Sequence, residues 1–119
     1  MADFIIFGSL ASSKNDRIWT GKNFILGESG QKYENLFKKQ IKRIRPKLVL
    51  PFTDFELLWV FEIYHNNKSA DASIELLFDL MEANNIVYND VIIRNYFVLA
   101  DELDMELPRT NIRVYKFNK

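Results

Sequence analysis

Residues 52–64 read Phe-Thr-Asp-Phe-Glu-Leu-Leu-Trp-Val-Phe-Glu-Ile-Tyr, and this stretch decides the fold. It is rich in aromatic and β-branched residues, which suit the pleated surface of a β-sheet. An apolar run of this length predicts one long strand at a central position in a sheet. Trp59 lies within the strand, and we expect its ring in the core. The polar residues 65–68 that follow predict a turn, with His65 as a turn residue rather than a base.

Two amphipathic helices are expected, one on each side of this strand in the sequence. The first covers residues 31–45, where apolar side chains recur at helical spacing and basic side chains occupy the opposite face. Its apolar positions include Tyr33, Leu36, Phe37, Ile41 and Ile44, and its basic positions are Lys32, Lys38, Lys39, Lys42, Arg43 and Arg45. The second helix covers residues 71–84, and Asn84 and Asn85 are expected to terminate it.

Three further strands complete the expected fold. Residues 3–7 form a short apolar run that Gly8 ends, and residues 91–99 form another apolar run. Residues 110–117 alternate apolar and polar side chains, which is typical of a half-exposed strand. The order β-α-β-α-β-β, with the last two strands as a hairpin, predicts an α/β or α+β fold around one mixed sheet. We expect a single domain over residues 1–119.

Two segments are expected to be irregular. All four glycines lie within residues 8–30, a long loop with a short extended piece near residues 23–26. Loops of this length in a small domain are often functional. Residues 101–108 are expected to form an acidic loop.

Composition excludes several classes of protein and site. The chain has 119 residues, 48% of them hydrophobic and 27% charged, which is the balance of a globular protein rather than a disordered one. There is no cysteine and only one histidine, so thiolate and multi-histidine metal sites are excluded. Any metal would be a hard cation held by carboxylates. No apolar run could span a membrane, and the N-terminus lacks the basic start of a secretory signal, so a cytoplasmic protein is expected.

The net charge of zero hides an asymmetry between the two halves. Residues 1–50 carry ten Lys or Arg against four Asp or Glu, and residues 51–119 carry six against twelve. A basic surface suits a polyanion such as nucleic acid, and an acidic cluster beside it suits metal-ion chemistry on that polyanion. The alternative is that both halves are solvated faces of one fold.

The candidate metal ligands are acids in and after the second helix. Asp71, Glu75 and Asp79 recur every four residues and share one side of that helix, and Asp90 lies where the chain returns to the next strand. Converging carboxylates repel one another, and a divalent cation relieves that repulsion. The alternative reading makes Asp71 a helix cap and the other acids solvent-facing residues.

Three motifs resemble those of one known family. They are Ser13-Lys14-Asn15-Asp16-Arg17 followed by Gly21, then Gly27-Glu28-Ser29-Gly30-Gln31-Lys32-Tyr33, and then Ser69-Ala70-Asp71-Ala72-Ser73-Ile74-Glu75 with Phe78-Asp79-Leu80-Met81 and Asn89-Asp90. Together they resemble the RusA family of Holliday junction resolvases, small phage and bacterial endonucleases that cut four-way DNA junctions. The resemblance runs from about residue 9 to residue 117.

The resemblance implies a crossover junction endodeoxyribonuclease that hydrolyses phosphodiesters with Mg²⁺ or Mn²⁺ and acts as a homodimer in recombination and repair. Asp71 and Asp90 match family aspartates that hold the metal, and Glu75, one turn from Asp71, is the candidate third carboxylate. Contacts to branched DNA are expected from the following residues: Lys14, Asn15, Arg17, Lys22 and Lys32.

Four positions depart from the family motif and keep other functions open. Ser69 and Asn89 stand where the family has aspartates, Ala72 replaces an asparagine, and Glu75 replaces a lysine. One alternative is therefore a catalytically degenerate relative that binds branched DNA or a protein. Another is an immunity or inhibitor protein, which would bind neither DNA nor metal.

Overall fold

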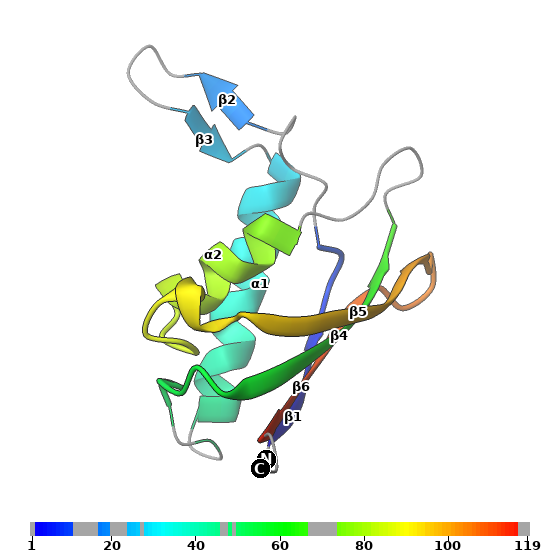
Figure 1. Cartoon of the computed structure of the whole chain (residues 1–119). Coiled ribbons are helices and arrows are strands. Elements are labelled where there is room, and N and C mark those ends of the chain that lie inside the picture. Colours follow the sequence, from blue (N-terminus) through cyan, green and yellow to red (C-terminus); the bar gives the residue numbers. More distant parts are fainter. Residues whose placement is uncertain are drawn as a thin grey trace.

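The computed structural model describes residues 2–10, 17–19, 24–26, 28–45, 48, 50–66 and 74–116. Their elements, in chain order, are β1 (Ala2–Phe7), β2 (Arg17–Trp19), β3 (Phe24–Leu26), α1 (Glu28–Ile44), β4 (Leu57–His65), α2 (Ile74–Ala83), the short 3-10 helix η2 (Asp90–Ile92), β5 (Asn95–Leu103) and β6 (Arg109–Lys116). The fold is α+β, and the main elements follow the expected β-α-β-α-β-β order (Figure 1). The small pair β2–β3 falls within the segment that was expected to be a loop.

The four main strands form one mixed sheet in the order β1-β6-β4-β5. Strand β6 runs antiparallel to both β1 and β4, whereas β5 runs parallel to β4. The expected interior position of the aromatic strand is confirmed, because β4 lies between β6 and β5. The expected terminal hairpin is wrong, because β5 and β6 lie on opposite sides of β4. Strand β5 follows a helical crossover from β4, and such a crossover returns the chain parallel to the strand it left.

Helices α1 and α2 pack on one face of the sheet (Figure 1). Helix α1 buries Tyr33, Phe37 and Ile41, which recur every four residues as the sequence pattern predicts. Helix α2 contributes a second apolar set, which consists of Leu76, Leu77, Leu80 and Met81. The strands supply alternate residues to the same core, among them Trp59, whose expected burial is confirmed. Within the part of the chain that the structure describes, no helix is long and apolar enough to cross a membrane.

The expected terminators of α2 are confirmed by its geometry. Asn85 has a positive φ of 56°, a left-handed conformation that asparagine adopts more readily than most residues. The side chain of Asn84 donates to the Leu80 carbonyl, and the Ile86 N–H donates to the Met81 carbonyl at 2.8 Å. These bonds satisfy carbonyl groups at the helix end and turn the chain toward η2.

Two strand boundaries differ from expectation, and side-chain capping explains both. The Asp54 carboxylate accepts the Glu56 N–H at 2.7 Å, which forms a turn, and β4 therefore begins at Leu57 rather than at Phe52. The Asn89 side chain accepts the Val91 N–H at 3.0 Å and starts η2, so β5 begins only at Asn95. The strand continues to Leu103 and contains the first residues of the expected acidic loop.

Candidate nucleic-acid interface and acidic residues

The exposed side of α1 is strongly basic. Its apolar stripe faces the sheet, and five cationic side chains lie on the exposed remainder of the helix: Lys32, Lys38, Lys39, Lys42 and Arg43. Lys38 forms an ion pair with Glu34 at 3.2 Å, within one helical turn. Such a row of cations can displace counterions from a nucleic-acid backbone. We call these five residues the basic face of α1.

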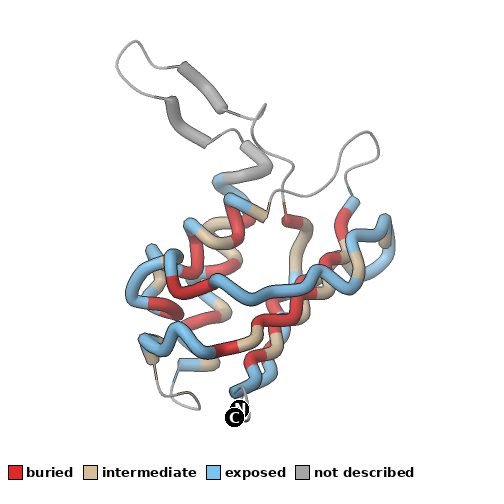
Figure 2. Tube along the Cα trace, in the orientation of Figure 1, coloured by how far each residue is buried: buried red, intermediate tan, exposed pale blue. Residues whose placement is uncertain are grey.

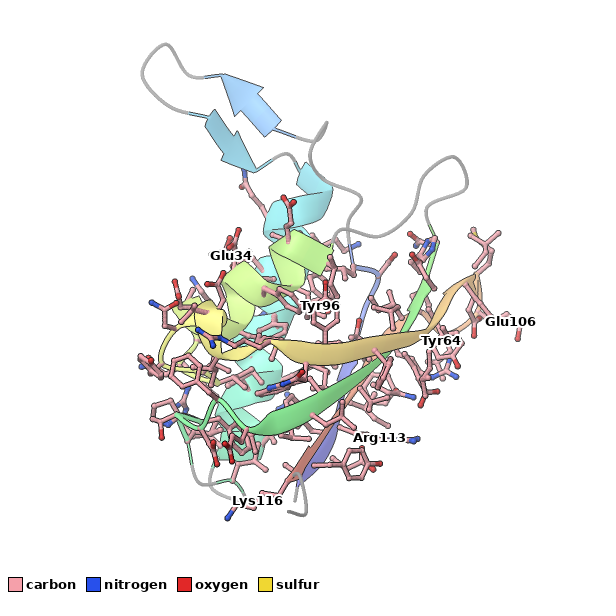
Figure 3. All side chains as sticks on the ribbon, viewed as in Figure 1. Glu34, Tyr64, Tyr96, Glu106, Arg113 and Lys116 are labelled. Carbon is pink, nitrogen blue, oxygen red and sulfur yellow. The ribbon has the colours of Figure 1, made fainter. Side chains whose placement is uncertain are left out.

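The two arginines on the open face of the sheet differ from most of the cations on α1, because each forms an ion pair with a nearby acid. Arg113 on β6, which is labelled in Figure 3, contacts Glu62 on β4 at 3.1 Å, and Arg109 contacts Asp104 in the loop before β6 at 3.0 Å. The guanidinium of Arg109 also lies 4.1 Å from the centre of the Tyr64 ring. The Tyr64 hydroxyl donates to Glu62, and this hydrogen bond raises the pKa of Tyr64. The basic face of α1 is therefore the better candidate for a polyanion.

Only one residue of the expected DNA-contact set has a described side chain. Lys32 is exposed near the start of α1 and belongs to the basic face. Arg17 lies in β2, where the backbone alone is described. Lys14, Asn15 and Lys22 lie outside the described residues. The other cations of α1 were predicted from the sequence to form a basic helix face but not to contact DNA.

The expected metal ligands occupy different places along α2. Glu75 is exposed in the first turn of the helix, and Asp90 begins η2, beyond its last turn. The backbone N–H of Asp90 donates to the Glu82 carboxylate at 2.9 Å. Because Glu75 and Glu82 are seven residues apart, the helix rises about 10 Å between them. The structure therefore sets Glu75 and Asp90 at opposite ends of α2.

Glu82 is the acid that the structure brings next to Asp90, and sequence reasoning did not single it out. Its proximity depends on the turn at Asn84–Asn85, so helical spacing alone could not reveal it. Asp79 is exposed in the middle of α2, and Asp71 lies outside the described residues. Among the described residues, no three His, Asp or Glu side chains form a group that could hold a metal ion. The predicted set of Asp71, Glu75 and Asp90 stays a prediction.

His65 is buried, which corrects its assignment to a turn. It is the last residue of β4 and only 4% exposed, and its Nε2 lies 3.0 Å from Oδ1 of Asp101 on β5. Asp101 reaches this place because it pairs with Ile63 of β4 in the parallel register of β4 and β5. Because residues 101–108 were expected to form a loop, the pairing of Asp101 with His65 was not predicted from the sequence.

A second buried polar contact joins α1 to the sheet. The hydroxyl oxygens of Tyr33 and Thr110 lie 3.3 Å apart, and both residues are buried. Burial raises the pKa of Tyr33, so its hydroxyl stays neutral at physiological pH. The contact therefore anchors the helix and supplies no charge to a ligand.

Comparisons of the chain with known proteins found no related family or protein. No protein-family model matches the chain, and no curated protein matches it. The case for a function consequently depends on the motifs and on the geometry of the described residues.

Proposed function

We propose that this protein binds branched DNA and nicks it as a RusA-like, Mg²⁺-dependent endonuclease of bacterial or phage origin, working as a homodimer in the cytoplasm. The observation that carries the DNA partner is the basic face of α1, whose five cations are exposed on one helix. The motifs quoted above support the resolvase class, and the α+β element order is compatible with it.

The available ligands suit a hard cation. The chain contains no cysteine, and His65 is buried against Asp101, which leaves carboxylate oxygens as the ligands. In this proposal Asp71 and Asp90 hold Mg²⁺ or Mn²⁺, and water molecules complete the coordination of the ion, because Glu75 lies at the opposite end of α2 from Asp90. The bound metal would polarise the phosphate and activate water. The contribution of α1 is to hold the DNA backbone, and the hydrogen bond from Asp90 to Glu82 fixes the start of η2.

A second function is favoured by one specific observation. Glu75 and Asp90 lie at opposite ends of α2, and the acid beside Asp90 is Glu82. Such an arrangement suits a relative that has kept the basic helix but lost the third ligand. That protein would bind branched DNA, or a protein, without cutting.

One assay distinguishes these functions. The full chain is incubated with a synthetic four-way junction and, separately, with a linear duplex, with and without Mg²⁺ at a fixed salt concentration. A gel shift reports binding, and denaturing gels report nicks. The nuclease proposal predicts junction-selective binding and symmetric nicks that require Mg²⁺. Binding without nicks supports the degenerate relative, and absence of binding at modest salt contradicts both.

A further inference from the structure

Strand β5 is an open edge of the sheet with apolar side chains on both of its faces. It pairs with β4 on one side, and among the described residues no strand pairs with its other side. Figure 2 shows β5 as an almost continuous exposed segment, whereas β4 and β6 are largely buried or half-buried. Phe97 is 58% exposed and Leu99 is 65% exposed. Leu99 also falls at a register shift and has no partner residue on β4.

The exposed apolar surface of the molecule is concentrated around this edge. Of the thirteen exposed large hydrophobic residues among those described, seven lie in β5 or in the loop that follows: Tyr96, Phe97, Val98, Leu99, Leu103, Met105 and Leu107. Monomeric proteins seldom expose a contiguous apolar patch of this kind without a partner.

The opposite edge of the sheet, strand β1, is partly blocked by a side chain from α1, in contrast to β5. On β1, the side chain of Gln40 from α1 accepts the Phe7 N–H and donates to the Phe7 carbonyl, both at 2.7 Å. A helix side chain therefore occupies part of the β1 edge. Strand β5 has no equivalent cap among the described residues, and it contains neither proline nor lysine, two residues that proteins use to block edge pairing.

The charges around β5 indicate which partner fits. Arg94 immediately precedes the strand, whereas Asp101 and Glu102 lie near its end. Among the described residues neither Arg94 nor Glu102 forms an ion pair; the Arg94 guanidinium lies over the Phe55 ring at 4.7 Å. Two copies of this strand in antiparallel orientation would place the basic start of each beside the acidic end of the other, while a parallel pair would oppose like charges.

We propose that β5 pairs antiparallel with β5 of a second copy of the chain, across a two-fold axis, to form one continuous eight-stranded sheet. The contact buries the apolar side chains of both edges and satisfies the backbone groups that each edge leaves open. A two-fold interface uses the same patch on both copies, as this self-complementary strand requires. The inference specifies the surface of the proposed homodimer, but it stands on the sheet alone and does not depend on nuclease activity.

Sedimentation velocity of the full chain over a wide concentration range, without DNA or metal, tests the inference. The wild type is expected to approach twice the 14.1 kDa monomer mass. Leu99→Lys adds a charge at the edge and is expected to weaken dimerisation at least about tenfold. Ile5→Lys, on the exposed side of β1, is the matched control and should leave the dimer unchanged. A wild type that stays monomeric, or a dimer that Leu99→Lys leaves intact, overturns the inference.

A charge exchange tests the antiparallel orientation. Arg94→Glu and Glu102→Arg are each expected to weaken the dimer, and the double variant is expected to regain most of the loss. Thermal melting of each variant shows whether the monomer stays folded, which matters because Arg94 also packs on Phe55. If all three variants are folded and the double variant does not dimerise more tightly than both single variants, the antiparallel pairing is contradicted.

Discussion

At the residue scale, the pair of His65 and Asp101 shows how a polar contact is built into the core. His65 is almost fully buried, and Asp101 provides an acceptor for its Nε2 at 3.0 Å. Buried polar groups need such partners, because an unsatisfied one costs about 1–3 kcal/mol. The pair also joins β4 to the edge strand β5, which has no fully buried residue of its own.

Asp101→Ala is therefore expected to lower the free energy of unfolding by about 1–3 kcal/mol, since it removes this partner from His65. Urea denaturation at neutral pH measures the change. Glu106→Ala is the matched control, because Glu106 is a nearby exposed acid in the loop after β5, without an ion pair among the described residues, and its effect should be within about 0.5 kcal/mol. Equal losses in the two variants would show that the contact contributes nothing specific.

The hydrogen bonds that Asp104 accepts are expected to make the free energy of unfolding depend on pH. The Leu107 N–H, and further the Arg109 side chain and the Glu106 N–H, hold the pKa of Asp104 below its ordinary value of 3.8. A carboxylate whose pKa is lowered by folding stabilises the protein above the unfolded pKa, and the contribution disappears as the pH falls through the folded pKa. Asp104→Asn should therefore be less stable than the wild type at neutral pH, with the difference vanishing in strong acid. Urea titrations at several pH values measure it, and a difference independent of pH would contradict this assignment.

At the element scale, the sequence predicts helices better than strand partners. The apolar stripe of α1 and the terminators of α2 are local patterns, so Tyr33, Phe37 and Asn85 are recognisable from spacing and residue type. Strand pairing is not local. Nothing in residues 104–108 distinguishes a hairpin loop from the connection that carries the chain to the other side of β4. The side-chain cap at Asn89 likewise converts an apolar run into a short helix.

The turn after α2 provides a matched pair of variants. Asn85 has a left-handed backbone, which costs a residue with a Cβ about 1–2 kcal/mol unless its side chain is asparagine or aspartate. Asn85→Ala is expected to lower the unfolding free energy by about 1 kcal/mol, while Asn85→Gly should be neutral or slightly stabilising. Chemical denaturation of both variants measures the effect. Equal destabilisation by alanine and glycine would show that the asparagine side chain, rather than the backbone conformation, matters.

The basic face of α1 predicts a salt-dependent interaction with DNA. The triple variant Lys39→Gln, Lys42→Gln, Arg43→Gln should weaken junction binding, and it should flatten the plot of log affinity against log salt by up to about three units, because each phosphate contact contributes about 0.9. Fluorescence anisotropy at several salt concentrations measures both quantities. Lys116→Gln, an exposed cation on β6, is the control and should leave the slope unchanged. An unchanged slope in the triple variant would remove α1 from the interface.

At the scale of the whole molecule, only the positive side of the charge asymmetry corresponds to one element of the fold. Among the described residues of the first half, the cationic side chains gather on α1, while the described acids of the second half are spread over β4 and the turn before it, α2, η2, β5 and the loop before β6. In the sequence, Glu75 was a candidate ligand because of its helical spacing from Asp71, and Asp90 because of its place after the helix and its match to a family aspartate. The sequence could not show that α2 separates Glu75 from Asp90 or that Glu82 lies beside Asp90, because both facts depend on how the chain leaves the helix.

Asp90→Asn tests whether the proposed metal site at Asp90 and the basic face of α1 act together as a nuclease. If Asp90 holds the metal, losing its charge should reduce Mg²⁺-dependent nicking of a four-way junction at least about a hundredfold, because a bound metal supplies several kcal/mol of transition-state stabilisation. Junction binding should persist, since the basic face of α1 is intact and a negative charge has been removed. Glu106→Gln is the matched control: it removes an acid beyond the opposite end of β5 from Asp90 and should leave nicking unchanged. If Asp90→Asn nicks junctions at the wild-type rate, Asp90 is not a metal ligand, and the nuclease proposal loses one of its two matched aspartates.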